Sequence, residues 1–274
     1  MAQSTSLYRV SDEDIRAFRR DGVVCLRNVV GADTVAMMRD ASLDVMENGG
    51  GRARLGANDQ AAGPRFFSST FLANSDDRFS AFALKSVMPG VAAQMMQVSD
   101  VRFFYDQLFI KEPGTTSVTA WHNDLPYWPL RGNDILSFWV ALTPVDAQSS
   151  GVQYVAGSHL WRTMFQAITP DMDPAFLNPD WKPAPNYSDP HERGEARLLS
   201  WDMEPGDVLV HHPLTAHGAG GNASASRMRI GLSLRYMGGD VQWDPRPYVM
   251  KLPVAPEVAE GAYPADDRAF PLCS

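Results

Sequence analysis

His122 and Asp124 are the residues of this 274-residue sequence whose types and spacing most directly suggest chemistry. They lie in the run Trp121–Pro126, WHNDLP, where an extended backbone would place alternate side chains on one face and aim both groups at a common point. An imidazole and a carboxylate are two of the three protein ligands in the two-histidine, one-carboxylate triad of non-haem iron oxygenases. The pair therefore predicts an iron site that needs a second histidine from elsewhere in the chain.

Three downstream histidines compete for that place. His211 and His212 continue the apolar strand pattern of Val208–Val210, so one of these two imidazoles must point inward. His217 opens a glycine-rich turn, HGAGGN, whose small residues would let the backbone approach a bound ligand closely. We prefer His217 as the second histidine and keep His212 as the reserve.

Composition and charge place the chain among ordinary globular proteins. Hydrophobic residues make up 45% and charged residues 20% of the sequence, so a large core can be buried and disorder is not expected. The formal net charge of −8 argues against nucleic acid or an anionic membrane as partner, because both require clustered Lys and Arg. We expect a small-molecule substrate, and the sequence leaves open whether the protein is a monomer or a homodimer.

The cysteines and the N-terminus bear on location. Cys25 and Cys273 lie near opposite ends of the chain and offer neither a disulfide framework nor a metal site. The first residues, MAQSTS, lack the basic and apolar regions of a signal peptide, and no apolar run is long enough to cross a bilayer. The predicted location is the cytoplasm.

The elements that must position the candidate ligands follow from apolar periodicity and turn signals. Ser11 is the expected N-cap of a helix that runs to about Arg20, Val23–Leu26 has the character of a buried strand, and a second helix covers about Asp33–Met46. From about residue 101 onward, strand-like segments alternate with turn-rich ones, and these strands are Val101–Ile110, Ile135–Leu142, Gly151–Val155, Asp207–His211 and Arg229–Tyr236.

Several short strands without intervening helices predict a mainly β protein with flanking helices, whose core is a cupin-like jelly roll, the double-stranded β-helix. We expect one domain over residues 1–274, with an N-terminal helical part over about 1–100, the jelly-roll core over about 101–240 and a C-terminal tail over about 241–274. The stretch Thr169–Gly194 is rich in Pro, Asp and Asn and is predicted to be a long insertion of the lid or binding-loop kind.

The run Trp121–Pro129, WHNDLPYWP, resembles the first iron-binding motif of the phytanoyl-CoA dioxygenase (PhyH) family of Fe(II)- and 2-oxoglutarate-dependent oxygenases. Further similarities occur in the family's order, at Phe18–Leu26, Gly151–His159, Gly206–Val210 and His217–Asn222. The resemblance thus covers most of the chain. It implies that the metal ligands are His122, Asp124 and His217.

The resemblance also implies an arginine that pairs with the distal carboxylate of 2-oxoglutarate. The usual position of that arginine is taken here by Met228, with Arg227 and Arg229 on either side. We favour Arg229, because Arg229–Tyr236 keeps the family's interval between the arginine and an aromatic residue, and Arg227 is the second choice. The planar fork of arginine can hold a carboxylate through two parallel hydrogen bonds. Trp139 matches a family tryptophan near the cosubstrate.

The implied activity couples oxidative decarboxylation of 2-oxoglutarate to oxidation of a small molecule, with Fe(II) as cofactor and dioxygen as the other cosubstrate. Hydroxylation is the expected outcome, with desaturation, cyclisation or epimerisation as alternatives. The carboxylate of Asp124 disfavours halogenation, since halogenating relatives have a small residue there. We expect an apolar or ring-bearing substrate of specialised metabolism or catabolism, because the candidate wall residues of the pocket are aromatic: Phe66, Phe67, Phe104, Tyr127, Trp128 and Trp201.

Two other classes of function stay open on the residues alone. A cupin-type, metal-dependent hydrolase or isomerase could use the same three ligands around zinc or manganese and would need no arginine for a keto acid. A non-catalytic jelly-roll protein that binds a sugar or a metal is the third class. A CoA thioester is not expected as substrate, because no basic cluster is available for its phosphates, and Arg131 and Lys111 are expected at the solvated surface.

Replacement of Arg229 by alanine should raise the 2-oxoglutarate requirement by the equivalent of roughly 2–5 kcal/mol, the usual cost of removing one member of a buried charge pair. The measurement is the concentration of 2-oxoglutarate that gives half-maximal succinate formation. If Arg227→Ala produces this change and Arg229→Ala does not, the assignment of the two arginines is reversed.

Overall fold

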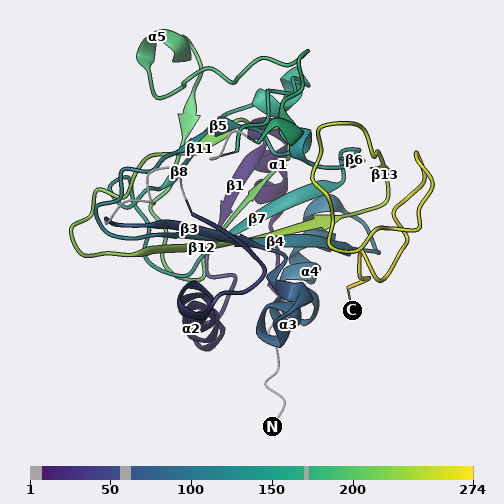
Figure 1. Cartoon of the computed structure of the whole chain (residues 1–274), viewed down its shortest axis with the longest axis horizontal. Coiled ribbons are helices and arrows are strands. Elements are labelled where there is room, and N and C mark those ends of the chain that lie inside the picture. The colour runs from purple at the N-terminus through teal and green to yellow at the C-terminus, as the bar shows by residue number, and fades with distance from the viewer. Residues whose placement is uncertain (1–7, 56–62, 170–172, 274) are drawn as a thin grey trace.

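The computed structural model describes residues 8–55, 63–169 and 173–273 of the chain. Its larger sheet is antiparallel and has the strand order β1 (Val23–Leu26), β10 (Val208–His211), β7 (Ile135–Ala141), β12 (Arg229–Met237), β4 (Arg102–Lys111), β3 (Phe66–Thr70) and β2 (Arg52–Leu55). The smaller sheet has the order β5 (Thr119–His122), β11 (His217–Ala219), β8 (Val152–Val155) and β9 (Leu198–Leu199). A further ribbon pairs β6 (Leu130–Arg131) with β13 (Gln242–Trp243). The smaller sheet faces the larger one (Figure 1), and this arrangement is the predicted jelly-roll core with flanking helices.

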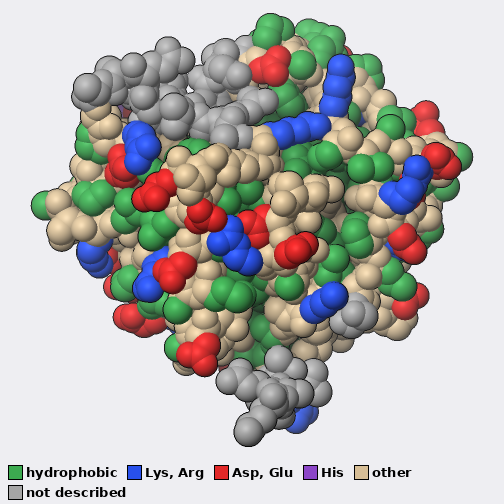
Figure 2. All heavy atoms as spheres, turned by 60° about the horizontal axis from the view of Figure 1, so that its bottom comes forward, with side chains coloured by type: hydrophobic (Ala, Val, Ile, Leu, Met, Phe, Trp, Pro, Cys, Tyr) green, Lys and Arg blue, Asp and Glu red, His purple; other side chains and the backbone are tan. Residues whose placement is uncertain are grey.

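Helices cover the side of the larger sheet that faces away from the smaller one (Figure 1). They are α2 (Ala32–Asn48), α3 (Asp77–Lys85) and α4 (Met88–Met96), while α1 (Asp12–Asp21) precedes β1 and α5 (Pro190–Arg193) lies in the predicted insertion. Short 3-10 helices occur at η1 (Leu72–Asn74), η2 (Leu125–Tyr127), η3 (Ser158–Trp161) and η4 (Pro174–Phe176). On the face that Figure 2 presents, acidic and basic side chains are interspersed. Within the described ranges, none of the helices has the length and apolar character needed to span a membrane.

The N-terminal helix begins and ends as the sequence predicts. The Ser11 hydroxyl accepts a hydrogen bond from the backbone N–H of Asp14, and the Asp14 carboxylate accepts one from the backbone N–H of Ser11. These reciprocal bonds form a capping box, which satisfies N–H groups that have no partner within the first turn. Gly22 ends the helix in the left-handed region, at φ 77°, a conformation that glycine adopts without strain.

Strand β12 shows how the larger sheet separates two environments. Its alternate side chains point to opposite faces, as in any strand. The face toward the helices is apolar and no more than 1% exposed, with Ile230, Leu232, Leu234 and Tyr236 packed into the cluster that includes α2, α3 and α4. The face toward the smaller sheet carries Arg229, Gly231, Ser233 and Arg235. Polar side chains on an inward face need partners, so a functional site is expected between the two sheets.

The strands predicted after residue 101 and at Val23–Leu26 are confirmed within a few residues, and two further strands, β2 and β3, lie before residue 101. β1, β2 and β3 belong to the larger sheet. The part before residue 101 is therefore not only helical, and the β core is not confined to residues 101–240. Local sequence is a weak signal for β3, FFSST, because a strand with polar residues is stabilised mainly by its pairing with β4.

The insertion and the C-terminal tail both pack onto the rest of the molecule. In the insertion, of which residues 170–172 lie outside the described part, η4 and α5 are the regular elements assigned. In the tail, Phe270 is fully buried and packs against Phe104, and Leu272 forms a bridge with Arg102. A role of the insertion as a lid stays a prediction.

The end of β10 sends two adjacent histidines to opposite sides of the larger sheet. His211 points between the sheets, whereas His212 is buried beside His159, with its backbone N–H bonded to the carbonyl of Gly22. The Nδ1 atom of His212 accepts a hydrogen bond of 3.1 Å from the Leu214 N–H, which requires that nitrogen to be unprotonated. Burial, aided by the neighbouring histidines, lowers the pKa of His212 to about 3.

Acidification should therefore destabilise the fold through His212. In the unfolded chain this side chain takes up a proton near pH 6.5, but in the folded protein only near pH 3, so the unfolded state binds more protons in between and stability falls as the pH falls. The loss is at most about 1.4 kcal/mol per pH unit within that window. Melting temperatures from pH 7 to pH 4 should fall less steeply for His212→Asn than for the wild type. The exposed His191→Asn variant should follow the wild type, and equal slopes for all three proteins would contradict the assignment.

Candidate metal centre and cofactor cavity

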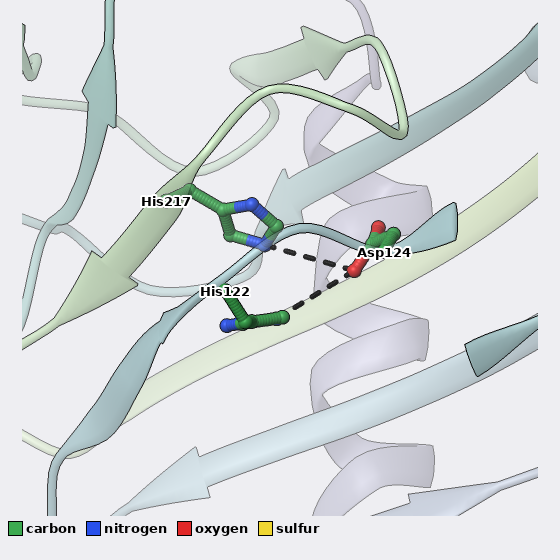
Figure 3. A group of neighbouring side chains, drawn as sticks. All are labelled: His122, Asp124 and His217. Carbon is green, nitrogen blue, oxygen red and sulfur yellow. Dashed lines mark ion pairs between the residues drawn. The ribbon is translucent and has the colours of Figure 1, made fainter. Parts of the chain in front are cut away.

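His122, Asp124 and His217 meet between the two sheets (Figure 3). His122 ends β5, His217 begins β11, and the antiparallel register places these two residues directly opposite each other. The Nε2 atoms of His122 and His217 lie 3.6 Å and 3.8 Å from Oδ1 of Asp124, and all three donor atoms fall within 4.8 Å of one another. The three residues could therefore hold one metal ion, and two imidazoles with one carboxylate form the donor set of a facial iron site.

Asp124 reaches this position by a turn and not by strand alternation. β5 ends at His122, and Asp124, with φ −78° and ψ −37°, stands at the start of η2. The backbone N–H groups of Asp124 and Leu125 both donate to the carbonyl of Pro213, at 2.7 Å and 3.1 Å. The side-chain amide of Asn123 donates to the carbonyl of Thr163 at 2.7 Å. The predicted extended backbone is therefore wrong beyond His122, and the turn brings the two side chains together.

The hydrogen bonds of the two imidazoles leave Nε2 free to bind a metal. The Nδ1 atom of His122 lies 2.7 Å from the carbonyl oxygen of Ala120, and that of His217 lies 2.9 Å from the carbonyl oxygen of Thr215. A carbonyl can only accept, so Nδ1 carries the proton in both rings, and Nε2 carries the lone pair that a metal requires. Burial lowers the pKa of His217 well below its usual value, so its ring is neutral.

The carboxylate of Asp124 is held by residues of the larger sheet. Its Oδ2 atom accepts hydrogen bonds from Oγ of Ser137 at 2.7 Å and Nε2 of His211 at 3.3 Å. The Tyr154 hydroxyl lies 3.3 Å from Nδ1 of His211 and fixes the other side of that ring. Burial alone would raise the pKa of Asp124, but the neighbouring imidazoles of His122 and His211 hold it well below the usual value. The group is therefore an ionised carboxylate whose Oδ1 faces the two histidines.

These contacts separate the three histidines that compete in the sequence. His217 supplies a donor atom to the cluster, whereas His211 lies behind the carboxylate as its hydrogen-bond donor. His212, the reserve, points to the other side of the sheet, outside the cavity described next.

A cavity of about 620 Å³ extends from the three residues between the sheets, a size suited to a small organic ligand. Arg229 lines it and is only 2% exposed. Its guanidinium donates to the carbonyl of Ser150 at 3.1 Å, and its Cζ atom lies 4.9 Å from the centroid of the Trp139 ring. Gly231 makes room for that ring, because a Cβ atom there would lie 1.9 Å from it.

Arg229 is a buried cation with no carboxylate partner in the described part of the chain. Burial lowers its pKa to about 10, so the side chain is still protonated at neutral pH. A buried charge is normally paired, and the carboxylate of a bound ligand would complete this one. Arg227 is neither buried nor unpaired, because its side chain is 42% exposed and forms an ion pair with Asp146.

Among the aromatic residues expected in the pocket wall, Phe66, Tyr127 and Trp128 line the cavity. Phe67, Phe104 and Trp201 do not, which corrects those three assignments. Phe67 follows Phe66 on β3 and so points to the opposite face, into the core beneath the helices.

Phe104 lies at an irregularity in strand pairing. The register between β4 and β12 shifts between Arg235 and Tyr236, so Phe104 is the extra residue of a bulge and packs against Phe270. Trp201 packs against the cluster that contains Tyr154, at a centroid distance of 6.4 Å from that ring. Neither Phe104 nor Trp201 lines the cavity.

The expectation that Lys111 lies at the surface is wrong, because its side chain is fully buried. Its Nζ atom donates to the carbonyl of Gly220 at 2.6 Å and lies 4.6 Å from the centroid of the Phe66 ring. Arg131 is exposed, as expected, and bonds to Gln242.

Sequence reasoning missed several residues that surround the cavity. Ser137 and Arg235 lie on the same faces of β7 and β12 as Trp139 and Arg229, and both line or adjoin the site. A polar residue at every second position of an otherwise apolar strand is the signal that would have found them. The insertion and the tail also contribute lining residues: Ile168, Thr169, Asp173, Ala175, Phe176, Val249, Met250 and Lys251.

Comparisons with known proteins agree with this geometry. The family model described as Phytanoyl-CoA dioxygenase (PhyH) matches residues 18–231. Among curated proteins, the multifunctional dioxygenase prhA of Penicillium brasilianum is 23% identical over 242 residues, which are 82% of this chain and 71% of that protein.

Two solved structures share the fold over nearly the whole chain. One is the non-heme alpha ketoglutarate dependent carbocyclase SnoK from nogalamycin biosynthesis, with a TM-score of 0.73, 23% identity and 97% of each chain covered. The other is the epimerase SnoN in complex with Fe3+, alpha ketoglutarate and nogalamycin RO, with a TM-score of 0.73, 23% identity, and 95% of this chain and 97% of that chain covered.

Removal of the Ser137 hydroxyl should weaken metal binding without removing a ligand. Loss of a partner that orients a ligating carboxylate typically costs about 10–100-fold in metal affinity. Calorimetric titration of the apo protein with Fe(II) under anaerobic conditions should show this change for Ser137→Ala. Ser233→Ala, a change on the same face of the sheet that leaves the Ser137 hydrogen bond intact, serves as the control. Wild-type affinity in Ser137→Ala would show that the hydrogen bond does not orient Asp124 for a metal.

Proposed function

Since the chain belongs to the phytanoyl-CoA dioxygenase family, we propose that His122, Asp124 and His217 are the ligands of its iron. The protein is an Fe(II)- and 2-oxoglutarate-dependent dioxygenase, and this membership decides against the hydrolase, isomerase and binding-protein alternatives. The observation that carries the ligand assignment is the convergence of three donor atoms within 4.8 Å at the wall of the cavity.

The three residues match the needs of a facial iron site. His122 and His217 present neutral Nε2 atoms, and Asp124 presents an ionised Oδ1 because its other oxygen is held by Ser137 and His211. Bound by these three residues on one side, the metal would be open to the cosubstrates on the side that faces the cavity. When bound, the iron supplies the redox chemistry in which 2-oxoglutarate and dioxygen yield succinate and carbon dioxide while the substrate is oxidised.

Arg229 is the residue we assign to the distal carboxylate of 2-oxoglutarate. It is buried, lines the cavity and has no carboxylate partner in the described ranges, whereas Arg227 is exposed and already paired with Asp146. Trp139 stacks on the guanidinium and so restricts its orientation, which lowers the entropy lost when the carboxylate binds. Arg227 is therefore set aside as the second choice.

The substrate is proposed to be an apolar or ring-bearing small molecule. Aromatic side chains on several sides of the cavity support this, among them Phe66, Phe71, Tyr105, Tyr127 and Phe176. Hydroxylation is the reaction we propose, and cyclisation and epimerisation stay as alternatives because SnoK and SnoN bear the names of a carbocyclase and an epimerase. We also propose a place in specialised metabolism or catabolism and a cytoplasmic location.

Substitution of either histidine ligand should abolish turnover. Purified protein supplied with Fe(II), ascorbate and 2-oxoglutarate should form succinate, while His122→Ala and His217→Ala should form no more than iron-free protein and should bind no iron. His159→Ala, a change outside the cluster, is the control for loss of a histidine. Asp124→Gly should also lose hydroxylation, and activity of the wild-type level in any of these three variants would disprove that ligand.

The reaction itself is best identified by mass spectrometry of candidate substrates under turnover. A gain of one oxygen indicates hydroxylation, and a loss of two hydrogens indicates desaturation or ring closure. Uncoupled succinate formation without substrate gives the baseline for the comparison.

A further inference from the structure

Arg235 is a second buried arginine on the inward face of β12. It is 3% exposed and lines the cavity. Its Nη2 atom donates to Oε1 of Gln107 at 3.3 Å, and its Cζ atom lies 4.4 Å above the centroid of the Tyr105 ring. Its Nε and Nη1 atoms have no hydrogen-bond partner within the described residues. Buried polar groups are nearly always hydrogen-bonded, so these two N–H groups call for a ligand.

The neighbouring carboxylates do not pair with this guanidinium. Asp106 accepts hydrogen bonds from the backbone N–H groups of Leu72 and Ala73, at 2.7 Å each. Asp124 is bonded to Ser137 and His211, and the ion pairs found in the described ranges include none of Arg235. Arg235 therefore carries a buried charge whose hydrogen-bonding capacity is largely unused.

The position of Arg235 places it beside the proposed iron site. The register between β12 and β7 sets Arg235 directly opposite Ser137, the residue that holds the carboxylate of Asp124. A group bound to Arg235 would thus lie one strand away from the residue that supports the metal ligand. Arg229 lies further along the same face of β12 and is assigned to 2-oxoglutarate, so the two arginines offer separate places.

The cavity as a whole is rich in positive charge, although the protein has a formal net charge of −8. Its basic lining residues are Arg52, Arg229, Arg235 and Lys251, and its acidic ones are Asp124 and Asp173. Asp124 is assigned to the metal and Arg229 to the cosubstrate, which leaves basic residues in excess. Such a cavity favours an anionic ligand.

We propose that the substrate carries a carboxylate and that Arg235 binds it. This proposal rests on the proposed function, because it takes the metal and Arg229 as already assigned. A planar guanidinium with unused N–H groups matches a carboxylate, which can accept two parallel hydrogen bonds and compensate the charge. A neutral carbonyl or hydroxyl would not offer the two parallel, charge-assisted hydrogen bonds that a carboxylate accepts from a guanidinium. The rest of the substrate would then lie among apolar side chains such as Phe71, Tyr127 and Met250.

Binding of matched acids and amides tests the proposal without turnover. The protein is loaded with Ni(II) and 2-oxoglutarate, and calorimetry measures the affinities of phenylacetate and cyclohexylacetate and of their amides. At least one acid should bind wild-type protein about tenfold more tightly than its amide, a difference typical of a hydrogen bond to a charged group. Arg235→Gln should lose this preference, and Arg235→Lys should keep part of it because the charge remains without the planar fork.

Two controls distinguish Arg235 from the cosubstrate site and from a structural role. The affinity for 2-oxoglutarate should be unchanged in Arg235→Gln, and Arg227→Gln should change neither affinity because it lies outside the cavity. Melting temperatures show which variants are folded. If Arg235→Gln does not fold, the preference for acids over amides is measured on Arg235→Lys instead, and that preference should be smaller than in the wild type.

Three results would overturn the proposal. They are equal affinities of acids and amides for the wild type, a preference that survives in Arg235→Gln, and a loss of 2-oxoglutarate affinity in that variant as large as in Arg229→Gln. Failure of the proposed function would be recognised separately, as a wild-type protein that binds no 2-oxoglutarate. In that event the acid and amide comparison can be made on the protein with the metal alone.

Discussion

The antiparallel pairing of β5 with β11 is the constraint on which the site depends. It sets His122 opposite His217 and brings two distant segments together with their ring centroids 4.3 Å apart. Because side chains alternate along a strand, a slip of one residue in this register would turn one imidazole to the wrong face. Gly218 supports the pairing, since a Cβ atom there would lie 3.0 Å from the Trp121 ring.

The third proposed ligand, Asp124, connects this small sheet to the larger one. Asp124 follows β5, but its carboxylate is held by Ser137 of β7 and His211 of β10. Metal binding would therefore link both sheets through one carboxylate, and the cavity lies where the sheets are joined. The support around the ligands is as much a part of the site as the ligands, because it decides which oxygen and which nitrogen atoms are available.

One face of the larger sheet contributes to stability, and the opposite face lines the candidate site. The face beneath the helices is apolar and supplies the main hydrophobic core, whereas the inward face carries Arg229, Ser233 and Arg235. Buried guanidinium groups with incomplete hydrogen bonding stabilise the fold little by themselves, and the proposed carboxylate ligands would complete their hydrogen bonds. An apolar outer layer that can sustain such a face is a physical requirement of this site.

Local sequence was sufficient for the caps of α1, five of the strands after residue 101, the candidate ligands and, through the resemblance of the motif around His122, the family. Alternation along a strand shows which residues share a face, but not which face meets the cavity, so Phe66 could not be separated from Phe67. The interval to Tyr236 favoured Arg229 over Arg227, and the burial of Arg229 and the ion pair of Arg227 with Asp146 support that choice. Only the tertiary structure decided that Lys111 is buried, that the tail reaches the cavity and that Arg235 stands beside the ligands. These three features depend on contacts between segments that lie far apart in the chain. Local composition does not show which of those segments will pair.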